Sequence, residues 1–256
     1  NLITVETYST VKQAYFMEEN QYTIDISSSG PICVYNEDFD NFTTSDVATN
    51  DCSGSKNKAP GKNWFMYAGG ANALTVTADK NLKFNGTSAI MYGGVNFGNI
   101  VNNFAGKDFV LSFDFWMETN GAFRLYADYY GEDYSGADTT LEFFELRDGG
   151  VQIKDNNSAY IKTENDTYTI GDWCTVEIVF LYNNGKYDKY SVRINGVPVY
   201  YTADGTKIDT FVLYGGLPVI NGFTVLASKN KVYYIDNCKI SDLCFNINFI
   251  IYNLFL

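Results

Sequence analysis

A series of Asx-Gly pairs lies between short runs of β-branched and aromatic residues and strongly limits the folds that this chain can adopt. Both residues of such a pair readily take the positive φ angles that tight two-residue β-hairpins require. The spacing therefore predicts many short antiparallel strands joined by tight turns. The pairs are Asn120-Gly121, Asp148-Gly149, Asn184-Gly185, Asn195-Gly196 and Asp204-Gly205.

The runs between these turns have the length and residue types of strands, and the main body contains no convincing long helix. We expect an all-β fold, a two-sheet antiparallel β-sandwich of the jelly-roll type with extra terminal strands. The N-terminal segments 2–8, 11–17 and 22–26 predict the extra strands, although 11–19 also has helical spacing. The strands expected in the main body are 73–77, 88–92, 109–118, 122–130, 140–147, 150–154, 173–182, 187–194, 197–202, 222–227 and 232–240.

The charge of the chain limits the classes of partner that it can bind. The formal net charge is −12 and the sequence pI is about 4.4, so the surface repels phosphate backbones and anionic lipid headgroups. We expect no nucleic-acid partner, and no segment is long and apolar enough to predict a membrane span. An acidic surface suits divalent cations and neutral sugars.

The chain contains no histidine. This absence excludes Ser–His–Asp and Cys–His nucleophile systems and histidine-ligated zinc. Any catalysis would have to use carboxylates, tyrosine or lysine.

The five cysteines show no Cys-x-x-Cys spacing, which argues against a zinc cluster. Cys33 with Cys52 and Cys238 with Cys244 are candidate disulfides, and so is a link between the two ends of the domain. Cys174 alternates in phase with apolar neighbours and is expected to be a buried thiol.

Four segments resemble landmarks of laminin G-like and concanavalin A-like jelly rolls. They are 36–40 (NEDFD), 107–115 (KDFVLSFDF), 171–178 (GDWCTVEI) followed by 187–196 (YDKYSVRING), and 233–240 (YYIDNCKI). The resemblance covers about 36–244. It implies the fold, which lectins, glycan-binding modules, adhesins, glycosidases and polysaccharide lyases share.

The landmarks also suggest a domain organisation. Residues 32–245 form the expected laminin G-like domain, and 246–256 form a C-terminal apolar strand. Residues 1–31 form a strand-rich arm or the end of a preceding module. Because the sequence begins with Asn1 rather than Met, we interpret it as a processed or excised chain.

The resemblance further implies one structural Ca²⁺ held between the terminal strands. Its expected ligands are Glu37, Asp38 and Asp40 from the opening strand and Asp236 from the closing strand. Calcium prefers six to eight oxygen ligands, which carboxylates supply. Alternatively, these carboxylates cap turns or face solvent.

Strand periodicity predicts a ligand-binding face. In 109–118 the odd-numbered residues are apolar and point to the core, so the even-numbered residues point outward. If the neighbouring strands share one sheet, a single outer face combines aromatic rings with hydrogen-bonding side chains, as sugar binding requires. Alternatively, it is an ordinary solvated face or is buried against a neighbour. The candidate ligand-binding residues are Asp114, Trp116, Arg124, Tyr126, Asp128, Tyr130, Glu177 and Arg193.

A catalytic alternative rests on Glu142 and Glu145. Retaining glycosidases need two carboxyl groups about 5–5.5 Å apart on one face. Residues three apart in a regular strand point to opposite faces, although a β-bulge could change this. We therefore do not expect an enzyme.

The favoured function is a non-catalytic, secreted or cell-surface module that binds glycan or another surface ligand. The first alternative is a structural subunit of an extracellular fibre, in which terminal strands such as the apolar segment 245–256 pair with further copies of the chain. A carboxylate-dependent glycoside hydrolase comes third.

Overall fold

The computed structural model of the chain confirms the all-β prediction. It describes residues 12–18, 20–28, 33–42, 64–68, 73–86, 91–97, 106–130, 137–154, 159–164, 168–243 and 247–253, and strands are their only regular secondary structure. No helix that could cross a membrane occurs among these residues. Residues 11–19 had two interpretations, and 12–18 form a strand.

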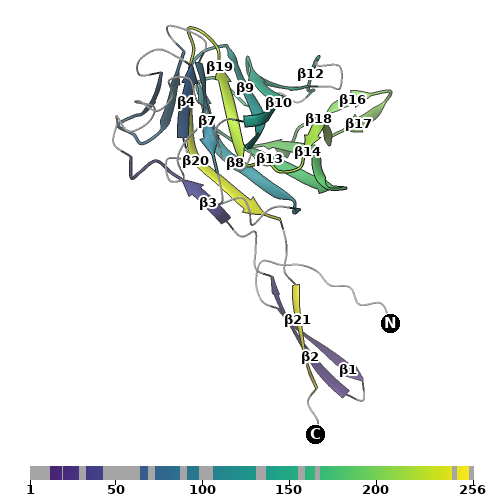
Figure 1. Ribbon diagram of the computed structural model, residues 1–256. Helices are drawn as coiled ribbons and strands as arrows, with labels where there is room; N and C mark the ends of the chain where they lie inside the picture. The colour runs from purple at the N-terminus through teal and green to yellow at the C-terminus, as the bar shows by residue number, and fades with distance from the viewer. Residues whose placement is uncertain are drawn as a thin grey trace.

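Two antiparallel sheets stack face to face as a sandwich (Figure 1). The seven-stranded sheet has the order β12-β11-β10-β9-β19-β7-β4. In that order the strands are Tyr160–Lys162, Gly150–Lys154, Ala137–Arg147, Ala122–Tyr130, Gly222–Ala227, Met91–Asn96 and Trp64–Ala68.

The nine-stranded sheet has the order β15-β14-β13-β8-β20-β6-β5, with β18 paired to β14 and β3 paired to β20. Its strands in that order are Val197–Pro198, Lys186–Ile194, Cys174–Asn183, Phe109–Met117, Val232–Asp242, Leu82–Asn85 and Leu74–Val76. The two further strands are β18 (Phe211–Leu217) and β3 (Cys33–Glu37), and a separate hairpin joins β16 (Tyr201–Ala203) to β17 (Thr206–Ile208).

The core lies between the two sheets, and its composition follows from side-chain alternation. Along β8, buried and half-buried residues alternate from end to end, as the period of two predicts. Phe115 of β8 meets Phe123 of β9 with ring centroids 4.9 Å apart, and Phe180 of β13 meets Phe223 of β19 at 5.6 Å. These contacts link strands of opposite sheets, so the aromatic residues hold the sandwich together.

Four of the five predicted Asx-Gly turns are confirmed. In each of the four, both residues have positive φ, for example 52° at Asp148 and 85° at Gly149. The four turns join β10 to β11, β13 to β14, β14 to β15 and β16 to β17.

The prediction for Asn120-Gly121 is wrong. Neither residue has a positive φ, and the chain crosses there from β8 in one sheet to β9 in the other. Glycine has a different role at this position, because a Cβ on Gly121 would lie 2.5 Å from the hydroxyl of Tyr233. The glycine permits close packing at the crossover rather than a hairpin.

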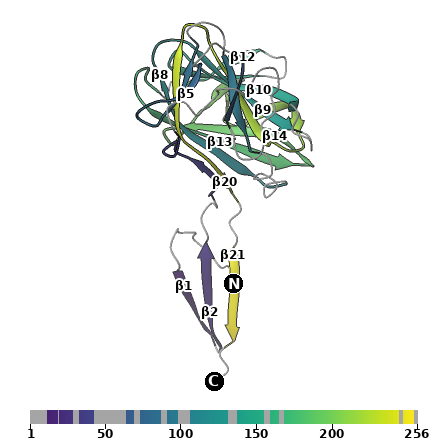
Figure 2. The same ribbon diagram turned by 60° about the vertical axis from the view of Figure 1, so that its left-hand side comes forward.

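The terminal segments form a small third sheet with the order β1-β2-β21. Its antiparallel strands are Lys12–Glu18, Asn20–Ser28 and Ile247–Asn253. Figures 1 and 2 show the C-terminal strand β21 alongside the N-terminal hairpin. The C-terminal strand therefore pairs within its own chain.

Candidate functional site

A β-bulge in β10 decides which of its side chains reach the outer face of the seven-stranded sheet. Glu142 pairs with Tyr126 of β9, and Phe144 pairs with the adjacent Leu125, so Phe143 is an extra residue without a partner in the register. The bulge turns Phe143 and Phe144 both into the core, where they are 1% and 0% exposed.

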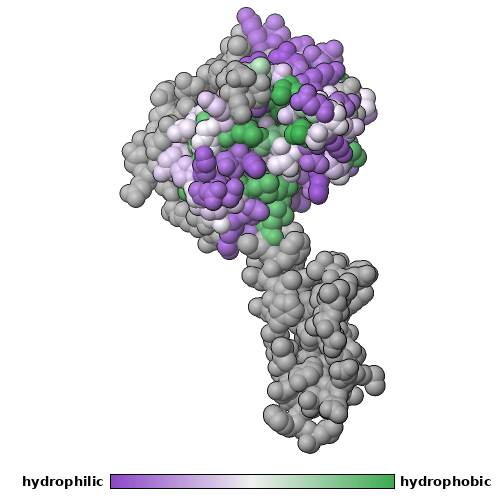
Figure 3. All heavy atoms as spheres, turned by 90° about the vertical axis from the view of Figure 1, so that its right-hand side faces the viewer, coloured by the Kyte–Doolittle hydropathy of each residue, from purple (hydrophilic) through white to green (hydrophobic). Residues whose placement is uncertain are grey.

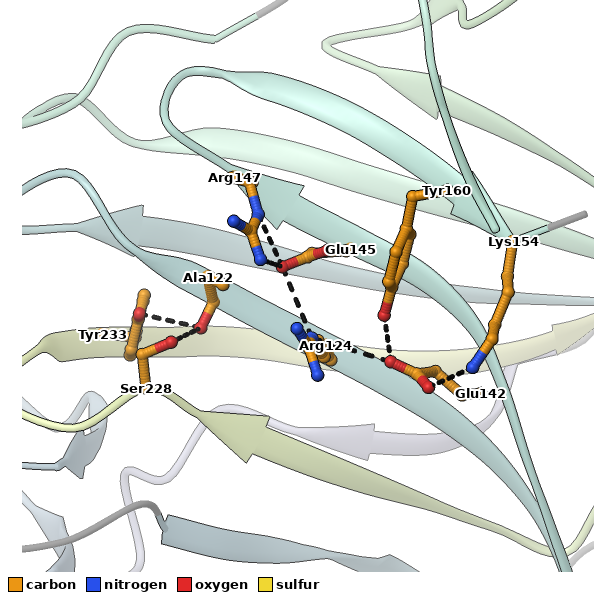
Figure 4. Close-up of polar contacts among 9 residues, drawn as sticks. All are labelled: Ala122, Arg124, Glu142, Glu145, Arg147, Lys154, Tyr160, Ser228 and Tyr233. Carbon is orange, nitrogen blue, oxygen red and sulfur yellow. Dashed lines mark hydrogen bonds and ion pairs between the residues drawn. The ribbon is translucent and has the colours of Figure 1, made fainter. Parts of the chain in front are cut away.

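The bulge brings the two carboxylates of β10 to one guanidinium group (Figure 4). Oε1 of Glu142 lies 3.6 Å, and Oε1 of Glu145 lies 3.4 Å, from Nε of Arg124 on β9. The expectation that these two glutamates point to opposite faces is therefore wrong. It assumed a regular strand, and one extra residue between them reverses the orientation of the second.

Glu145 is fully buried, with a side chain 0% exposed. Its Oε1 accepts hydrogen bonds from Nε of Arg147 at 2.8 Å and from Nε of Arg124 at 3.4 Å, and Nη2 of Arg147 lies 2.7 Å away. Its Oε2 is also buried and has no hydrogen-bond partner in the part of the chain that the structure describes. Leaving a buried acceptor unpaired costs stability, so packing alone does not explain this carboxylate.

Glu142 is also held by hydrogen bonds from Tyr160 on β12 and Lys154 on β11. The hydroxyl of Tyr160 donates to its Oε1, and Nζ of Lys154 donates to its Oε2. Burial alone would raise the pKa of Glu142. The hydrogen bonds from Lys154 and Tyr160, together with the charges of Lys154 and Arg124, lower this pKa below its ordinary value.

Tyr160 supplies an aromatic ring that two cations approach. Cζ of Arg124 lies 5.5 Å and Nζ of Lys154 lies 5.7 Å from the ring centroid, within the range of cation–π attraction. Burial, and then the hydrogen bond to Glu142, raise the pKa of the Tyr160 hydroxyl well above its ordinary value. The phenol therefore stays protonated near neutral pH.

These residues form one connected group, which we call the β9–β12 cluster. Its charged and donor groups are fixed by one another on four neighbouring strands. Glu142 is ionised and Tyr160 is protonated near neutrality, so the cluster offers fixed charges rather than proton transfer between these two groups. The members of the β9–β12 cluster are Arg124, Glu142, Glu145, Arg147, Lys154 and Tyr160.

Strand β9, which carries Arg124, is anchored at its first residue. The hydroxyls of Tyr233 and Ser228 both donate to the backbone oxygen of Ala122, at 2.8 and 3.0 Å (Figure 4). These bonds tie the beginning of β9 to β20 and to the end of β19. They therefore set the position of Arg124 two residues further along.

Arg147, Lys154 and Tyr160 are site residues that the sequence did not predict. The adjacent Phe143 and Phe144 in an otherwise alternating strand were a usable sign of the bulge. The Asp148-Gly149 turn also fixes how β11 pairs with β10, and hence the face that Lys154 occupies. We find no sequence signal for Tyr160, because its strand has only three residues.

The predicted ligand-binding face does not exist as one surface. The prediction required β8 and β9 to share a sheet, and the crossover at Gly121 places them in opposite sheets. Four candidates belong to the nine-stranded sheet and four to the seven-stranded sheet, so the structure separates them. The first four are Asp114, Trp116, Glu177 and Arg193, and the second four are Arg124, Tyr126, Asp128 and Tyr130.

The second set of candidates is itself divided. Arg124 belongs to the cluster, and half-buried Tyr126 pairs in register with Glu142. Asp128 is 0% exposed and accepts a hydrogen bond from the hydroxyl of Thr224 at 2.5 Å, so it is not available to a surface ligand. The side chain of Tyr130 lies outside what the structure describes.

The first set lies around Asp114 on the outer face of the nine-stranded sheet. The hydroxyl of Thr175 donates to Oδ1 of Asp114 at 2.7 Å, and Nδ2 of Asn237 donates to Oδ2 at 2.8 Å. Trp116 contacts Tyr234 edge to face, with ring centroids 5.1 Å apart. These are the cross-strand pairs expected of an ordinary sheet face. Glu177 is half-buried and Arg193 is exposed on the same face.

The predicted calcium ligands lie near one another without forming a ligand set. Burial raises the pKa of Asp236, and the charges of Asp114, Asp38 and Asp40 raise it further. Asp38 and Glu37 accept hydrogen bonds from nearby backbone amides, as turn caps do. Among the described residues, no group of three or more acidic or cysteine side chains could hold a metal ion. Calcium binding remains a prediction.

The described cysteines are free thiols. Cys33 is exposed, whereas Cys174 and Cys238 are buried, which confirms the prediction for Cys174. No disulfide joins any two of these three described cysteines. Cys52 and Cys244 lie outside the described residues.

The fold and the cluster define a β-sandwich with a charged outer face, and the solved structures that are similar to the chain are similar only at low identity. No known protein family and no curated protein matches the chain. A carbohydrate esterase from the Shiga toxin-encoding bacteriophage phi24B is 13% identical, with a TM-score of 0.49, over 84% of this chain and 100% of that one.

Two other kinds of solved structure are similar at the same level. An alginate lyase in complex with alginate tetrasaccharide is 14% identical, with a TM-score of 0.47, over 80% of this chain and 95% of that one. The binding domain of botulinum neurotoxin serotype D is 14% identical, with a TM-score of 0.42, over 70% of this chain and 42% of that one. The match thus spans less than half of the toxin domain.

Proposed function

We propose that this chain is a non-catalytic extracellular binding module whose ligand is a glycan, bound on the outer face of β9–β12. The observation that carries the proposal is the β9–β12 cluster itself. A bulge places two carboxylates beside three cations and a tyrosine on one face of the sheet. Fully solvated side chains at these positions would avoid the free-energy cost of burying charged groups.

The cluster has the chemistry that sugar recognition uses. Planar guanidinium and carboxylate groups form directional hydrogen bonds with sugar hydroxyls, and aromatic rings contact the apolar faces of sugars. The side chains of Arg124, Arg147 and Lys154 are 29%, 37% and 21% exposed, so a ligand can reach them without unfolding the sheet. Their mutual contacts pre-organise them, which lowers the entropy lost on binding.

The same geometry argues against a carboxylate-dependent glycosidase, although Glu142 and Glu145 share a face. Such an enzyme needs one carboxylic acid that is protonated near neutral pH. The pKa of Glu142 is lowered, not raised, and Arg124 contacts both carboxylates as a counter-charge. The glutamates orient cations rather than act as an acid and a nucleophile.

A glycan array followed by calorimetry with the best ligand tests the proposal. We expect Lys154→Met to weaken binding by about tenfold, because it removes a charge-assisted contact at the cluster. The matched control is Trp116→Ala on the other sheet, which should leave the affinity unchanged. Loss of binding in the control alone, or no binding to any glycan, would contradict the proposal.

Assembly into a fibre is the second candidate, and one observation favours it. Strand β21 lies at the edge of the small sheet and contains no charged residue, whereas the opposite edge strand β1 begins with Lys12 and ends with Glu18. Uncharged edge strands add further strands most readily. Electron microscopy of the chain, with and without residues 245–256, tests this alternative.

A further inference from the structure

The outer face of β9–β12 differs in charge from the rest of the protein. The β9–β12 cluster contains three cations and two carboxylates, whereas the whole chain carries a net charge of −12. A fourth cation extends this face: Lys162 pairs in register with Gln152 and lies two residues after Tyr160 on β12. Residues two apart in a strand share a face, so exposed Lys162 lies beside the cluster.

The carboxylates of the cluster do not cancel this charge for an approaching ligand. Glu145 is 0% exposed and Glu142 is 14% exposed, whereas Arg147 is 37% exposed and Lys162 is exposed. The negative groups are therefore buried beneath the positive ones. An approaching ligand meets guanidinium and ammonium groups first.

The chain otherwise repels anions, so a local cationic surface discriminates between ligands. A neutral sugar only accepts ordinary hydrogen bonds from these four cations, whereas a carboxylate gains stronger, charge-assisted hydrogen bonds from arginine and lysine. We infer that the glycan is acidic and that uronate carboxylates bind to Arg147, Lys154 and Lys162, an inference that rests on the proposed glycan-binding function.

Calorimetry with three matched ligands tests the inference: an oligogalacturonate, its methyl ester, and a neutral glucose oligomer of the same length. The ester keeps the sugar ring and loses the charge. We expect the free acid to bind at least about tenfold more tightly than the ester. Raising NaCl from about 50 to about 300 mM should weaken binding of the acid only.

Two variants locate the effect. Lys162→Gln changes an exposed side chain and should weaken acid binding by about threefold without a change in the thermal midpoint. Arg147→Gln should weaken it by about tenfold, and far-UV circular dichroism checks that this variant folds. The matched control is Lys189→Gln, which changes an exposed side chain on β14 of the other sheet and should have no effect.

The possible outcomes distinguish failure of the acidic-glycan inference from failure of the proposed glycan-binding function. Equal binding of the acid, the ester and the neutral oligomer would overturn the acidic ligand and leave glycan binding intact. Binding of a sulfated oligosaccharide but not the uronate would also overturn it. Failure of every glycan to bind would overturn both.

Discussion

The ion pair between Glu145 and Arg147 is expected to stabilise the fold far more than an ordinary surface pair. We propose to replace each residue by glutamine, singly and together. Glutamine keeps the approximate shape of glutamate and removes its charge. The double variant then isolates the interaction between the two groups from their separate contributions.

The magnitude follows from the geometry. Nε and Nη2 of Arg147 lie 2.8 and 2.7 Å from Oε1 of Glu145, whose side chain is 0% exposed. Two charges about 4 Å apart at an effective dielectric constant of about 20 attract by about 4 kcal/mol. Arg147 is 37% exposed, so water screens part of this attraction. We expect a coupling energy of about 1.5–3 kcal/mol, above the ~0–1 kcal/mol of exposed pairs.

Urea unfolding at neutral pH, followed by tryptophan fluorescence, measures the coupling. Glu145→Gln alone should lower the free energy of unfolding by about 2–3 kcal/mol, because Arg147 loses its counter-charge and Arg124 keeps only that of Glu142. Combined instead with Arg193→Gln on the opposite sheet, its effect should add within about 0.5 kcal/mol. A coupling energy between Glu145 and Arg147 below about 0.5 kcal/mol would refute the buried-pair reasoning.

Two further predictions concern the core. Gly94→Ala should lower the free energy of unfolding by about 2–3 kcal/mol in urea titrations, because its Cβ would lie 2.0 Å from the backbone oxygen of Phe223 on the paired strand. A loss below about 0.5 kcal/mol would contradict this prediction, because it would show that β7 and β19 move apart to accept the methyl group at little cost. Burial raises the pKa of the Cys174 thiol from an ordinary value near 9 to about 12. Between these two values the thiol is protonated in the native state and ionised in the unfolded chain. Its contribution to the free energy of unfolding is therefore complete below about pH 9 and is lost as the pH rises toward 12. The decline should be smaller in Cys174→Ala, as measured by thermal unfolding across this range.

The fold class was predictable because alternation is a local property. Residues such as Phe113 and Phe115 are 2% and 0% exposed because their positions in β8 place them on the inner face. The four confirmed Asx-Gly turns were predictable for the same reason, because their positive φ angles depend on two adjacent residues.

The candidate site was only partly predictable. Arg124 was correctly placed on an outer face, and Glu142 and Glu145 were recognised as a carboxylate pair. Their common face depends on Phe143 packing against Phe180 and Tyr190 of the opposite sheet, with ring centroids 5.4 and 4.9 Å apart. That contact is long-range, so strand periodicity could not show it.

A reader of the sequence alone could predict an all-β fold and the inward side of strands such as β8, because both follow from a period of two along each strand. The composition of each outer face, by contrast, depends on long-range packing. The crossover at Gly121 separates Trp116 from Arg124, and the bulge at Phe143 joins Glu142 to Glu145. Both depend on how one sheet packs on the other, and that packing is a property of the whole core.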